Sequence, residues 1–472
     1  MRILMVTIGY PPKYVGGTEI YVFGLVEELK ERGHECAITY LEPFAEPHGP
    51  EFRLVSNTHL GTDVHVVQVN TAIHKLEFVM FDAALRNKLV AQFRKLVDQI
   101  DPDVIHLHPL QLGLESYLVE ELNQTGRKVV MTFHSSTTTC ARGDLIYMGE
   151  TVCDGQIIQK RCSKCLYHWK SVPKPLSATL SQLPLSWYRR AHNGLSSTSH
   201  LRKLRSFASI PLTIDERKKA WVRTTANSKA IVAVCDWVRD TIIRNGVSPE
   251  KVVSSRHGLR LSGKQNGNQR IGVARFGYLG RISPEKGIAV LLEALQGMPA
   301  NLSFEFEFCS SSFRATARRP EEDRLVNAIQ ELQRTDARVR VLEGVSDDDL
   351  RNVIAKWDAI IVPSLWLESG PQVVYEAFAV HTPVIGSRLG GIAELVSDGV
   401  TGLLCAPGDV GQLRNLMLRS AEHPQVMREL RDNIPPVRTT SQVAEDMVQL
   451  YQRIASPKRA LSEVNLPVEA SV

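Results

Sequence analysis

The chain has 472 residues, of which 43% are hydrophobic and 23% are charged, with a formal net charge of +5. This composition is typical of a globular protein and excludes a disordered or fibrous chain. The length predicts two or three domains. The net charge is modest for this length, so we expect no nucleic-acid partner.

The apolar run at residues 3–8 is followed directly by Tyr10, Pro11 and Pro12. It is too short for the apolar core of a secretory signal peptide, so it predicts a strand. No stretch of the sequence approaches the roughly 18 to 20 apolar residues that cross a bilayer. We therefore expect a cytoplasmic protein.

The first half of the chain alternates short apolar runs with helical patterns at 18–32 and 85–100. Because parallel strands need long crossover connections, this alternation predicts a parallel sheet wrapped by helices. An insertion at about 140–226 interrupts the alternation. Buried strands are predicted at residues 2–8, 35–40, 64–69, 104–108, 129–133, 230–235 and 252–255.

A polar, glycine-rich stretch at 261–269 predicts a linker, and a second alternating series follows it. Two Rossmann-like lobes result, at 1–260 and 270–436. A helix at 437–456 is expected to cross back to the first lobe, and a flexible tail is expected at 457–472. Strands of the second lobe are predicted at 275–279, 303–308, 339–342, 359–363, 383–386 and 402–405, with helices that begin near Gly287, Glu321, Asp347, Pro371, Ile392 and Asp409.

Residues 365–379 follow an apolar strand and open a helix. Gly370 and Pro371 stand where backbone amides and the positive end of the helix dipole face a bound anion or sugar. Glu368 precedes this turn, and Glu376 lies inside the helix. A carboxylate accepts two hydroxyl hydrogen bonds at once, so these acids suit sugar and ribose hydroxyls. Two glutamates at this spacing are otherwise ordinary helix surface.

Downstream come Gly390, Gly391 and Glu394, and then a glycine-rich stretch at 399–404. With these glycines after the two glutamates, the chain resembles retaining glycosyltransferases, in particular glycosyltransferase family 4. The signature of that family is two glutamates separated by seven residues. The resemblance covers nearly the whole chain outside the insertion. It implies the α/β fold called GT-B, in which two Rossmann-like lobes with parallel sheets face each other across a cleft that holds a nucleoside diphosphate sugar.

The resemblance also implies roles for individual residues. Glu368 contacts hydroxyls of the donor sugar, and Glu376 contacts the ribose. Family members often carry Phe where this chain has Ser369 and Leu where it has Gln372, which leaves the donor sugar open. The rest of the implied donor site is the backbone at Gly370, Pro371 and Gln372 and a far wall at Gly390, Gly391 and Glu394.

The loop after the strand at 275–279 carries Gly280, Arg281 and Lys286. The leaving nucleoside diphosphate gains charge as the glycosidic bond breaks, so fixed cations stabilise the transition state more than the ground state. The loop lies at the carboxyl end of a strand, which favours a role in stabilising the diphosphate over that of a solvated surface loop. The family resemblance assigns the same two cations to the diphosphate.

Gly16 and Gly17 lie between the first strand and a helix start, where small residues permit close approach of a ligand. Their spacing is not that of the three-glycine dinucleotide fingerprint. By resemblance, this loop touches the donor phosphate or the acceptor, and His134, at a strand's carboxyl end, lies beside the donor sugar. His106 and His108, at the end of the preceding strand, point toward the same cleft.

The sequence shows neither a paired carboxylate at the expected cleft positions of the first lobe nor a clear Asp-x-Asp metal motif that would serve the donor phosphates. An inverting enzyme needs a base that deprotonates the acceptor, whereas retaining enzymes of this resemblance let the departing phosphate oxygen take the proton. We therefore expect a retaining hexosyltransferase with no magnesium requirement.

Four of the eight cysteines, Cys140, Cys153, Cys162 and Cys165, fall within 26 residues. A Cys-x-x-Cys pair and two further thiolates complete a tetrahedron, which predicts a structural zinc ion. An iron–sulfur cluster uses the same ligands and is the alternative. Disulfides would need an oxidising compartment, which the lack of a signal peptide argues against.

Residues 170–223 are rich in Lys and Arg, with Trp187, Tyr188, Phe207 and Trp221 among them. Such a segment predicts contact with an anionic membrane or a charged acceptor, and a solvated helical face is the alternative. Together these features predict sugar transfer to a lipid-linked saccharide or polysaccharide at the inner face of the cell membrane, in cell-surface glycan synthesis. A nucleotide-sugar epimerase on the same fold and a non-catalytic, metal-containing nucleotide-sugar sensor are the alternatives.

Overall fold

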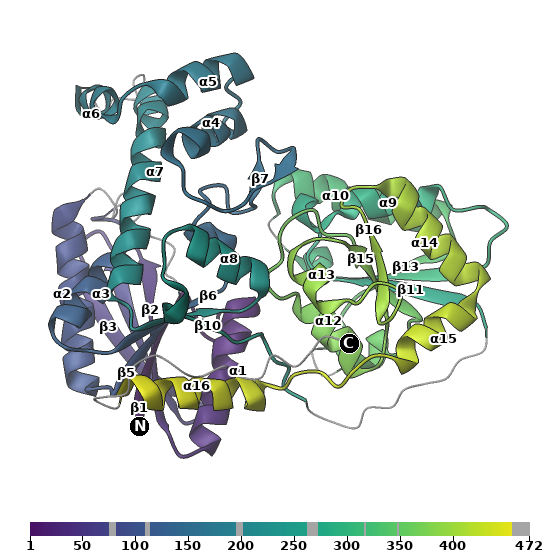
Figure 1. The fold of residues 1–472 in the computed structure, drawn as a ribbon, viewed down its shortest axis with the longest axis horizontal. Coiled ribbons are helices and arrows are strands. Elements are labelled where there is room, and N and C mark those ends of the chain that lie inside the picture. The colour runs from purple at the N-terminus through teal and green to yellow at the C-terminus, as the bar shows by residue number, and fades with distance from the viewer. Residues whose placement is uncertain are drawn as a thin grey trace. The chain divides into compact units, whose positions relative to one another are not determined.

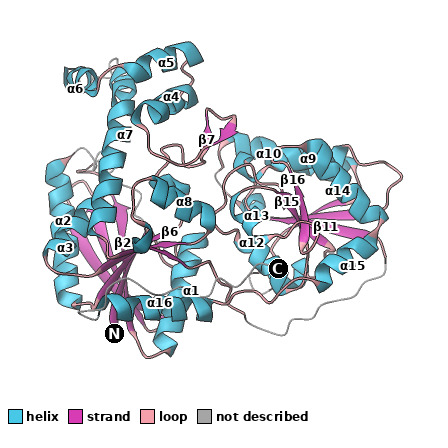
Figure 2. Cartoon of the chain, viewed as in Figure 1, coloured by secondary structure: helices cyan, strands magenta, loops and turns pink. Residues whose placement is uncertain are grey.

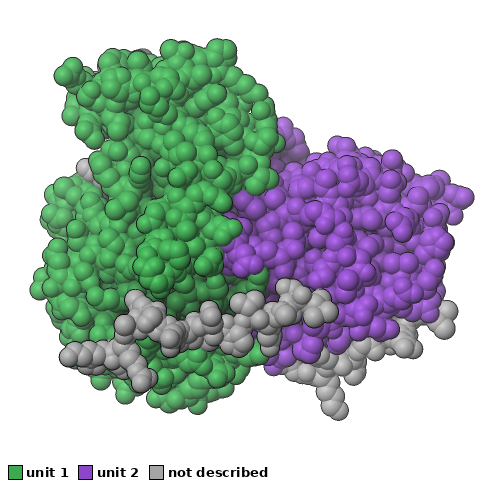
Figure 3. Space-filling model, in the orientation of Figure 1, with its two compact units in different colours: residues 1–234, 238–256, 440–472 green, residues 235–237, 257–439 purple. Residues whose placement is uncertain are grey.

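The computed structural model describes residues 1–74, 82–108, 114–194, 202–261, 272–315, 318–346 and 349–455. The chain forms two compact units (Figure 3). Unit 1 contains residues 1–234, 238–256 and the chain from 440 onward, and unit 2 contains residues 235–237 and 257–439. The predicted tail, most of the predicted linker and the helix start predicted at Asp347 lie outside the described residues.

Unit 1 is built on an eight-stranded sheet in the order β10-β9-β6-β5-β1-β2-β4-β3. Figure 2 colours strands magenta and helices cyan. Neighbouring strands pair in parallel except β3 and β4, which are antiparallel. β1 is buried from Ile3 to Val6, as a strand covered by helices on both faces requires. The strands are β1 (Arg2–Thr7), β2 (Glu35–Phe44), β3 (Phe52–His59), β4 (Thr62–Asn70), β5 (Val104–Leu107), β6 (Val129–Phe133), β9 (Ala230–Ala233) and β10 (Val252–Ser254).

The edge strand β3 is missing from the predicted set of strands. Six of its eight residues are exposed, so it carries no buried apolar run of the kind that predicts a strand. It pairs with β4 through a tight connection at Leu60 and Gly61, both with positive φ. The predicted parallel sheet therefore ends in one antiparallel hairpin.

The helices of unit 1 include the last described helix of the chain, α16 (Thr440–Ala455). Its Val443, Met447, Leu450 and Tyr451 recur at helical spacing and pack into the same core as β1 and α1 (Gly17–Glu31). The remaining helices flanking this sheet are α2 (Ala83–Ile100), α3 (Glu115–Gln124) and α8 (Asp236–Arg244), the last of which begins with residues of unit 2.

The predicted insertion between β6 and β9 is mostly helical. It opens with a 3-10 turn (Ser136–Thr138) and a small hairpin of β7 (Ile146–Tyr147) and β8 (Thr151–Val152). The long helix α7 (Arg202–Asn227) then leads back to the sheet. Figure 1 shows α4 (Gln159–Trp169), α5 (Lys174–Gln182) and α6 (Leu185–Gly194) gathered around the end of α7 that lies away from the sheet.

Unit 2 is built on a six-stranded, wholly parallel sheet in the order β13-β12-β11-β14-β15-β16. Its strands are β11 (Ala274–Leu279), β12 (Phe304–Cys309), β13 (Val339–Leu342), β14 (Ala359–Val362), β15 (Val384–Ser387) and β16 (Gly402–Cys405). Its helices are α9 (Ile288–Gln296), α10 (Pro320–Thr335), α11 (Leu350–Ile354), α12 (Gln372–Ala379), α13 (Gly390–Leu395), α14 (Val410–Glu422) and α15 (Pro424–Asp432).

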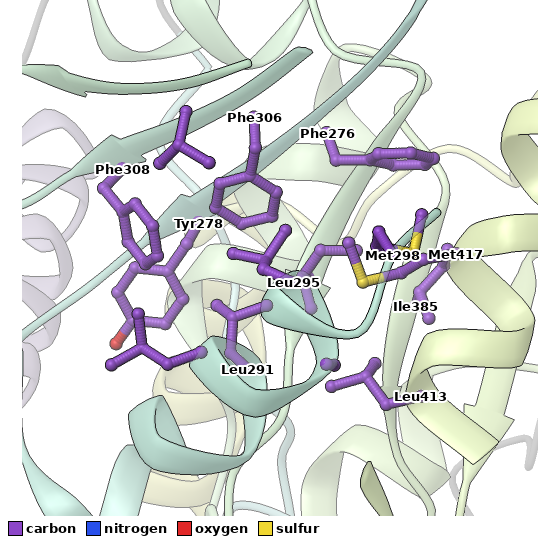
Figure 4. Packing of buried hydrophobic residues seen from close by; sticks show 14 of the residues in the cluster. Phe276, Tyr278, Leu291, Leu295, Met298, Phe306, Phe308, Ile385, Leu413 and Met417 are labelled. Carbon is purple, nitrogen blue, oxygen red and sulfur yellow. The ribbon is translucent and has the colours of Figure 1, made fainter. Parts of the chain in front are cut away.

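Aromatic side chains of β11 and β12 fill the core of unit 2. Phe276, Phe306 and Phe308 are fully buried, and the rings of Phe306 and Phe308 lie 4.8 Å apart (Figure 4). Leucines of α9 and α14, among them Leu291 and Leu413, cover them. Burial of this size stabilises the sheet and holds the ends of its strands in register.

Candidate functional site

Three loops of unit 2 meet at one edge of its sheet. β11 pairs with β14, and β14 pairs with β15, all in parallel. The loops that follow these strands, at 280–287, 363–371 and 388–390, therefore leave the same edge side by side. In an open α/β sheet this carboxyl edge is where ligands bind. The predicted donor residues of the second half belong to these loops and to the helices that they open.

The loops after β11 and β14 are joined by an ion pair between two predicted site residues. Lys286 Nζ lies 2.6 Å from Oε1 of Glu368, and the hydroxyl of Ser364 donates to the same oxygen at 2.8 Å. Glu368 is buried, at 7% exposure. A carboxylate in that setting needs a cation and donors to stay charged, and Lys286 and Ser364 supply them.

Gly287 makes this approach possible. Its φ is +74°, a left-handed conformation that favours glycine, and a Cβ there would overlap the carbonyl oxygen of Pro363. The short 3-10 turn of Pro284–Lys286 is thereby pressed against the end of β14. The loop with Arg281 is held by Tyr278, whose hydroxyl donates to the carbonyl oxygen of Arg281 at 2.6 Å.

Trp366 stands next to the ion pair. The ammonium of Lys286 lies 5.6 Å from the centre of its ring. The Trp366 indole N–H is buried and has no hydrogen-bond partner within the described part of the chain. Arg281 is exposed. The loops after β11 and β14 thus present the exposed Arg281, the paired Lys286 and the buried indole N–H of Trp366.

Glu376 is held by a residue that sequence reasoning missed. Arg351 of α11 lies 3.3 Å from its Oε2, and Arg351 also donates to the carbonyl oxygen of Arg260 at 3.3 Å. Arg351 precedes its partner by 25 positions on another helix, and no spacing rule connects the two. Neither a motif nor a periodicity in the sequence signals this pair.

The backbone between Glu368 and α12 is closely packed. Gly391 N–H donates to the carbonyl oxygen of Glu368 at 2.8 Å, and a Cβ on Gly391 would come within 2.7 Å of that oxygen. A Cβ on Gly370 would collide with the ring of His257. Burial lowers the pKa of His257 to about 4, so this ring is neutral. The glycines of the motif are therefore required by packing, whatever they bind. Pro371 caps α12 at its start, and Gln372 is the first residue of that helix.

Glu394 caps another helix of the chain. Its two carboxylate oxygens accept the backbone N–H groups of Asp236 and Trp237, at 2.8 and 2.9 Å. The indole N–H of Trp237 donates to the carbonyl oxygen of Glu368 at 2.8 Å. Residues 235–237 belong to unit 2, so these are contacts inside that unit. They give Glu394 a structural role that the sequence did not indicate.

The predicted residues of unit 1 also stand at strand ends. Gly16 and Gly17 form the start of α1, which follows β1. His134 follows β6, and its Nε2 lies 2.7 Å from Nδ1 of His108, which follows β5. Because β5 and β6 are parallel neighbours, both histidines lie at the same edge.

Behind this pair, His106 lies within the sheet and is bonded on both sides. Its Nδ1 lies 2.6 Å from the hydroxyl of Tyr451 in α16, and its Nε2 lies 2.6 Å from the hydroxyl of Thr132. Burial lowers the pKa of His106 to about 3 and the pKa of His108 well below its usual value. His106 therefore joins α16 to the sheet, and its predicted orientation toward a ligand is wrong.

The four clustered cysteines line one pocket of the insertion. Their sulfurs have separate polar neighbours: Cys165 accepts the Met148 N–H at 3.2 Å, Cys162 lies 3.8 Å from the Gln156 carbonyl oxygen, and Cys153 lies 3.8 Å from the Asp154 carboxylate. Burial raises the pKa of Cys153 and of Cys162, which favours neutral thiols.

The predicted zinc or iron–sulfur site receives no support from this arrangement. Among the residues that the structure describes, which include Cys140, Cys153, Cys162 and Cys165, no three His, Cys, Asp or Glu side chains are grouped so that they could hold a metal ion. None of the eight cysteines, all of which the structure describes, is in a disulfide bond. Spacing in the sequence brought the four thiols to one pocket but did not fix where their sulfurs point.

Two family profiles match the sequence of this chain. Residues 265–435 match the family described as "Glycosyl transferases group 1", and residues 15–195 match "Glycosyltransferase Family 4". D-inositol 3-phosphate glycosyltransferases of Mycobacterium bovis and Mycobacterium tuberculosis are 31% identical over 193 residues. That match covers 39% of this chain, and the chain spans 39% of the length of these relatives.

Solved structures with a similar fold cover nearly the whole chain. Sucrose-phosphate synthase from Thermosynechococcus elongatus gives a TM-score of 0.62 at 18% identity, covering 96% of this chain and 98% of that one. Anabaena HepE in complex with UDP gives 0.57 at 15% identity, with 96% and 100% covered. A trehalose-6-phosphate protein from E. coli bound with UDP-2-fluoro glucose gives 0.60 at 11% identity, with 96% and 99% covered.

Within the ranges that the structure describes, no helix is both long enough and apolar enough to span a membrane.

Proposed function

This chain belongs to the family 4 glycosyltransferases with the GT-B fold, and from that membership we propose that it transfers a hexosyl group from a nucleoside diphosphate sugar to an acceptor with retention of configuration. The predicted fold class is confirmed. In this proposal unit 2 binds the donor and unit 1 binds the acceptor.

The observation that carries the proposal is the pair of Lys286 and Glu368 beside the exposed Arg281 at the carboxyl edge of the unit 2 sheet. We assign the two cations to the donor diphosphate. On donor binding, Lys286 exchanges its carboxylate partner for a phosphate oxygen. Glu368 is then available to accept hydrogen bonds from sugar hydroxyls, with Ser364 still bonded to it.

The chemistry that follows is a substitution at the anomeric carbon. The bond from that carbon to the phosphate oxygen breaks, a bond to the acceptor oxygen forms on the same face, and the acceptor proton passes to the departing phosphate. Arg281 and Lys286 stabilise the negative charge that grows on the diphosphate. This route needs no carboxylate base and no magnesium ion.

The remaining donor contacts follow from the residues around this centre. Glu376 binds the ribose hydroxyls while Arg351 holds its charge and orientation. Backbone groups at Gly280, Gly370, Pro371, Gln372 and Gly391 line the sugar and phosphates, and Glu394 orients that wall through its cap on residues 236 and 237. In unit 1, we assign the start of α1 at Gly16 and Gly17 to phosphate or acceptor, and His134 to a sugar hydroxyl.

We propose a lipid-linked saccharide or polysaccharide as the acceptor, in cell-surface glycan synthesis at the inner membrane face. The relatives' name points to a phosphorylated polyol as the acceptor of those proteins. An acceptor panel for this chain therefore includes inositol phosphates beside lipid-linked and polymeric saccharides.

A panel of nucleoside diphosphate sugars tests the proposal. A ligand that binds the folded state raises the melting temperature, and calorimetry then measures its affinity. Product formed with an acceptor should keep the anomeric configuration of the donor by NMR. Donor epimerised without acceptor would show an epimerase, and binding without transfer across the acceptor panel would show a sensor.

A further inference from the structure

The helical insertion of unit 1 has an unusual charge pattern. Between Gly155 and Ile214 the sequence contains ten Lys and Arg residues and no Asp or Glu. The described residues of this stretch form α4, α5, α6 and the first half of α7, and we call these helices the distal cap. A solvated helical face normally mixes both signs of charge, so 60 residues without one acid mark a surface for an anionic partner.

The helices of the distal cap are packed and hydrogen-bonded to one another within unit 1. Tyr167 of α4 is buried and its hydroxyl donates to the carbonyl oxygen of Phe207 in α7 at 3.1 Å. Tyr188 of α6 is buried as well, and its hydroxyl donates to the carbonyl oxygen of Leu180 in α5. These bonds join α4 to α7 and α6 to α5, and α4 also contacts α5 as α6 contacts α7. Figure 1 shows the cap at the end of α7 remote from the strands of the sheet.

Large apolar side chains of the cap point outward. Trp169 and Trp187 are each 49% exposed, Leu176 is 51% exposed and Leu204 is 56% exposed. Trp187 and Tyr188 are neighbours in α6, with one ring outside and the other inside. Tryptophan is usually largely buried in a protein. Two tryptophans and two leucines exposed on one small helical cluster therefore indicate a partner with an apolar layer.

Cations stand beside these apolar side chains. The ammonium of Lys170 lies 4.6 Å from the centre of the Trp169 ring, and Arg189 and Arg190 come two and three residues after Trp187. Acids outside the acid-free stretch pair with three of its cations: Arg161 with Asp154, Lys174 with Glu150 and Arg189 with Asp215. Within the described side chains of the cap, Lys160, Lys170 and Arg190 are exposed and have no carboxylate within ion-pair distance.

We propose that the distal cap is a docking surface for an anionic lipid bilayer. Tryptophan and leucine enter the boundary between headgroups and acyl chains, while lysine and arginine bind the anionic headgroups around them. A soluble polyanion such as a nucleic acid satisfies the cations but leaves Leu176 and Leu204 in water. The inference deepens the proposed function, since it brings the acceptor-binding unit to the surface where a lipid-linked acceptor resides. Vesicle binding itself requires no transferase activity.

Flotation with vesicles tests the docking surface on the full chain. Vesicles of equal parts phosphatidylglycerol and phosphatidylcholine should carry the protein, and vesicles of phosphatidylcholine alone should not. The double variant Lys170→Glu/Arg190→Glu should lower the partition coefficient at least about tenfold, because each cation near an anionic surface contributes severalfold. The matched control is Lys95→Glu/Lys229→Glu, which makes the same charge change at exposed positions elsewhere on unit 1 and should bind as the parent does.

Lipids with brominated acyl chains test whether the apolar side chains enter the bilayer. They should quench part of the tryptophan fluorescence of the parent, and Trp169→Phe/Trp187→Phe should remove that quenching while vesicle binding persists. Equal partition of the parent and the Lys170→Glu/Arg190→Glu variant overturns the proposal, and so does quenching that survives the loss of both tryptophans. Capture by heparin without capture by anionic vesicles also overturns it. Donor calorimetry on the same variants, expected to be unchanged, keeps a failure of the docking surface distinct from a failure of the transferase proposal.

Discussion

Lys286 Nζ lies 2.6 Å from Glu368 Oε1 at the edge of the unit 2 sheet. The two residues come from different loops, and the pair closes because Gly287 lets one loop press against the other. A cation assigned to the diphosphate and an acid assigned to the sugar thus form an ion pair with each other. Their separation on donor binding is the step on which the proposed chemistry depends.

Lys286→Ala should lower turnover more than donor affinity. We expect a loss of about 100-fold or more in kcat, because the charge that Lys286 stabilises is largest in the transition state. The donor Kd, from calorimetry, should rise by less than about tenfold. Equal losses in both quantities would mean that Lys286 binds ground state and transition state alike.

The same variant has a stability effect that must be separated from catalysis. It leaves the buried carboxylate of Glu368 without a cation, which we expect to lower the free energy of unfolding by about 2 kcal/mol. Lys286→Ala/Glu368→Gln should regain most of that stability without regaining turnover. If the double variant regains turnover, the loss in the single variant is a folding defect.

Gly287→Ala should damage the site through backbone geometry alone. A Cβ there meets the Pro363 carbonyl oxygen, and φ of +74° adds strain. We expect a loss of about 2 kcal/mol or more in the free energy of unfolding and a fall in kcat that follows the displacement of Lys286. Gly399→Ala is the matched control, since φ is +75° there and no atom lies within 4 Å of the new Cβ. The two variants should differ clearly in urea denaturation, and equal losses would contradict the packing argument.

Much of the fold could be predicted because its strands are buried on both faces. β1, β5 and β14 are short apolar runs between helical patterns, and such runs have the same appearance in any parallel sheet. β3 could not be predicted, since it is solvated and gains its strand conformation from pairing with β4. The difference is tertiary contact, which a local pattern does not contain.

The site could be predicted in part for the same reason. Lys286 and Glu368 lie in the loops that follow the buried strands β11 and β14, and parallel topology brings such loops together. Arg351 and the cap that Glu394 provides depend on how separate helices pack, and no motif announces them. For the cysteines, the spacing in the sequence predicts a shared location. It does not predict the rotamers, which turn their sulfurs toward separate partners.

Glu376→Ala should weaken donor binding through the ribose. We expect the donor Kd to rise about tenfold, as for the loss of hydrogen bonds to a charged acceptor. A donor analogue that lacks the ribose hydroxyls should bind the parent and the variant equally well. Unchanged affinity for the full donor, or an equal loss with the deoxy analogue, would contradict the ribose contact and leave Glu376 as the partner of Arg351 alone.

Lowering the pH should destabilise the folded chain already at pH values above those at which most carboxylates titrate. His106 and His257 are neutral in the folded chain, with pKa values lowered by burial to about 3 and about 4 from an ordinary value of 6.5. The unfolded chain takes up these protons first, so the stability due to burial is complete above pH 6.5 and falls as the pH drops toward 4 and 3. At pH 5 each histidine should lower the free energy of unfolding by about 2 kcal/mol relative to pH 8.

Urea denaturation between pH 8 and pH 5 measures this slope. The slope is proportional to the difference in the number of bound protons between the unfolded and the folded chain. His106→Gln should lower that difference by about one proton, because the glutamine amide does not titrate in this range. The variant will also be less stable at every pH, since it disturbs the bonds to Tyr451 and Thr132, so the slope and not the absolute value is the readout. His48→Gln, at an exposed position, is the control. A slope that His106→Gln leaves unchanged would mean that His106 is already charged in the folded chain, contrary to its burial between the sheet and α16.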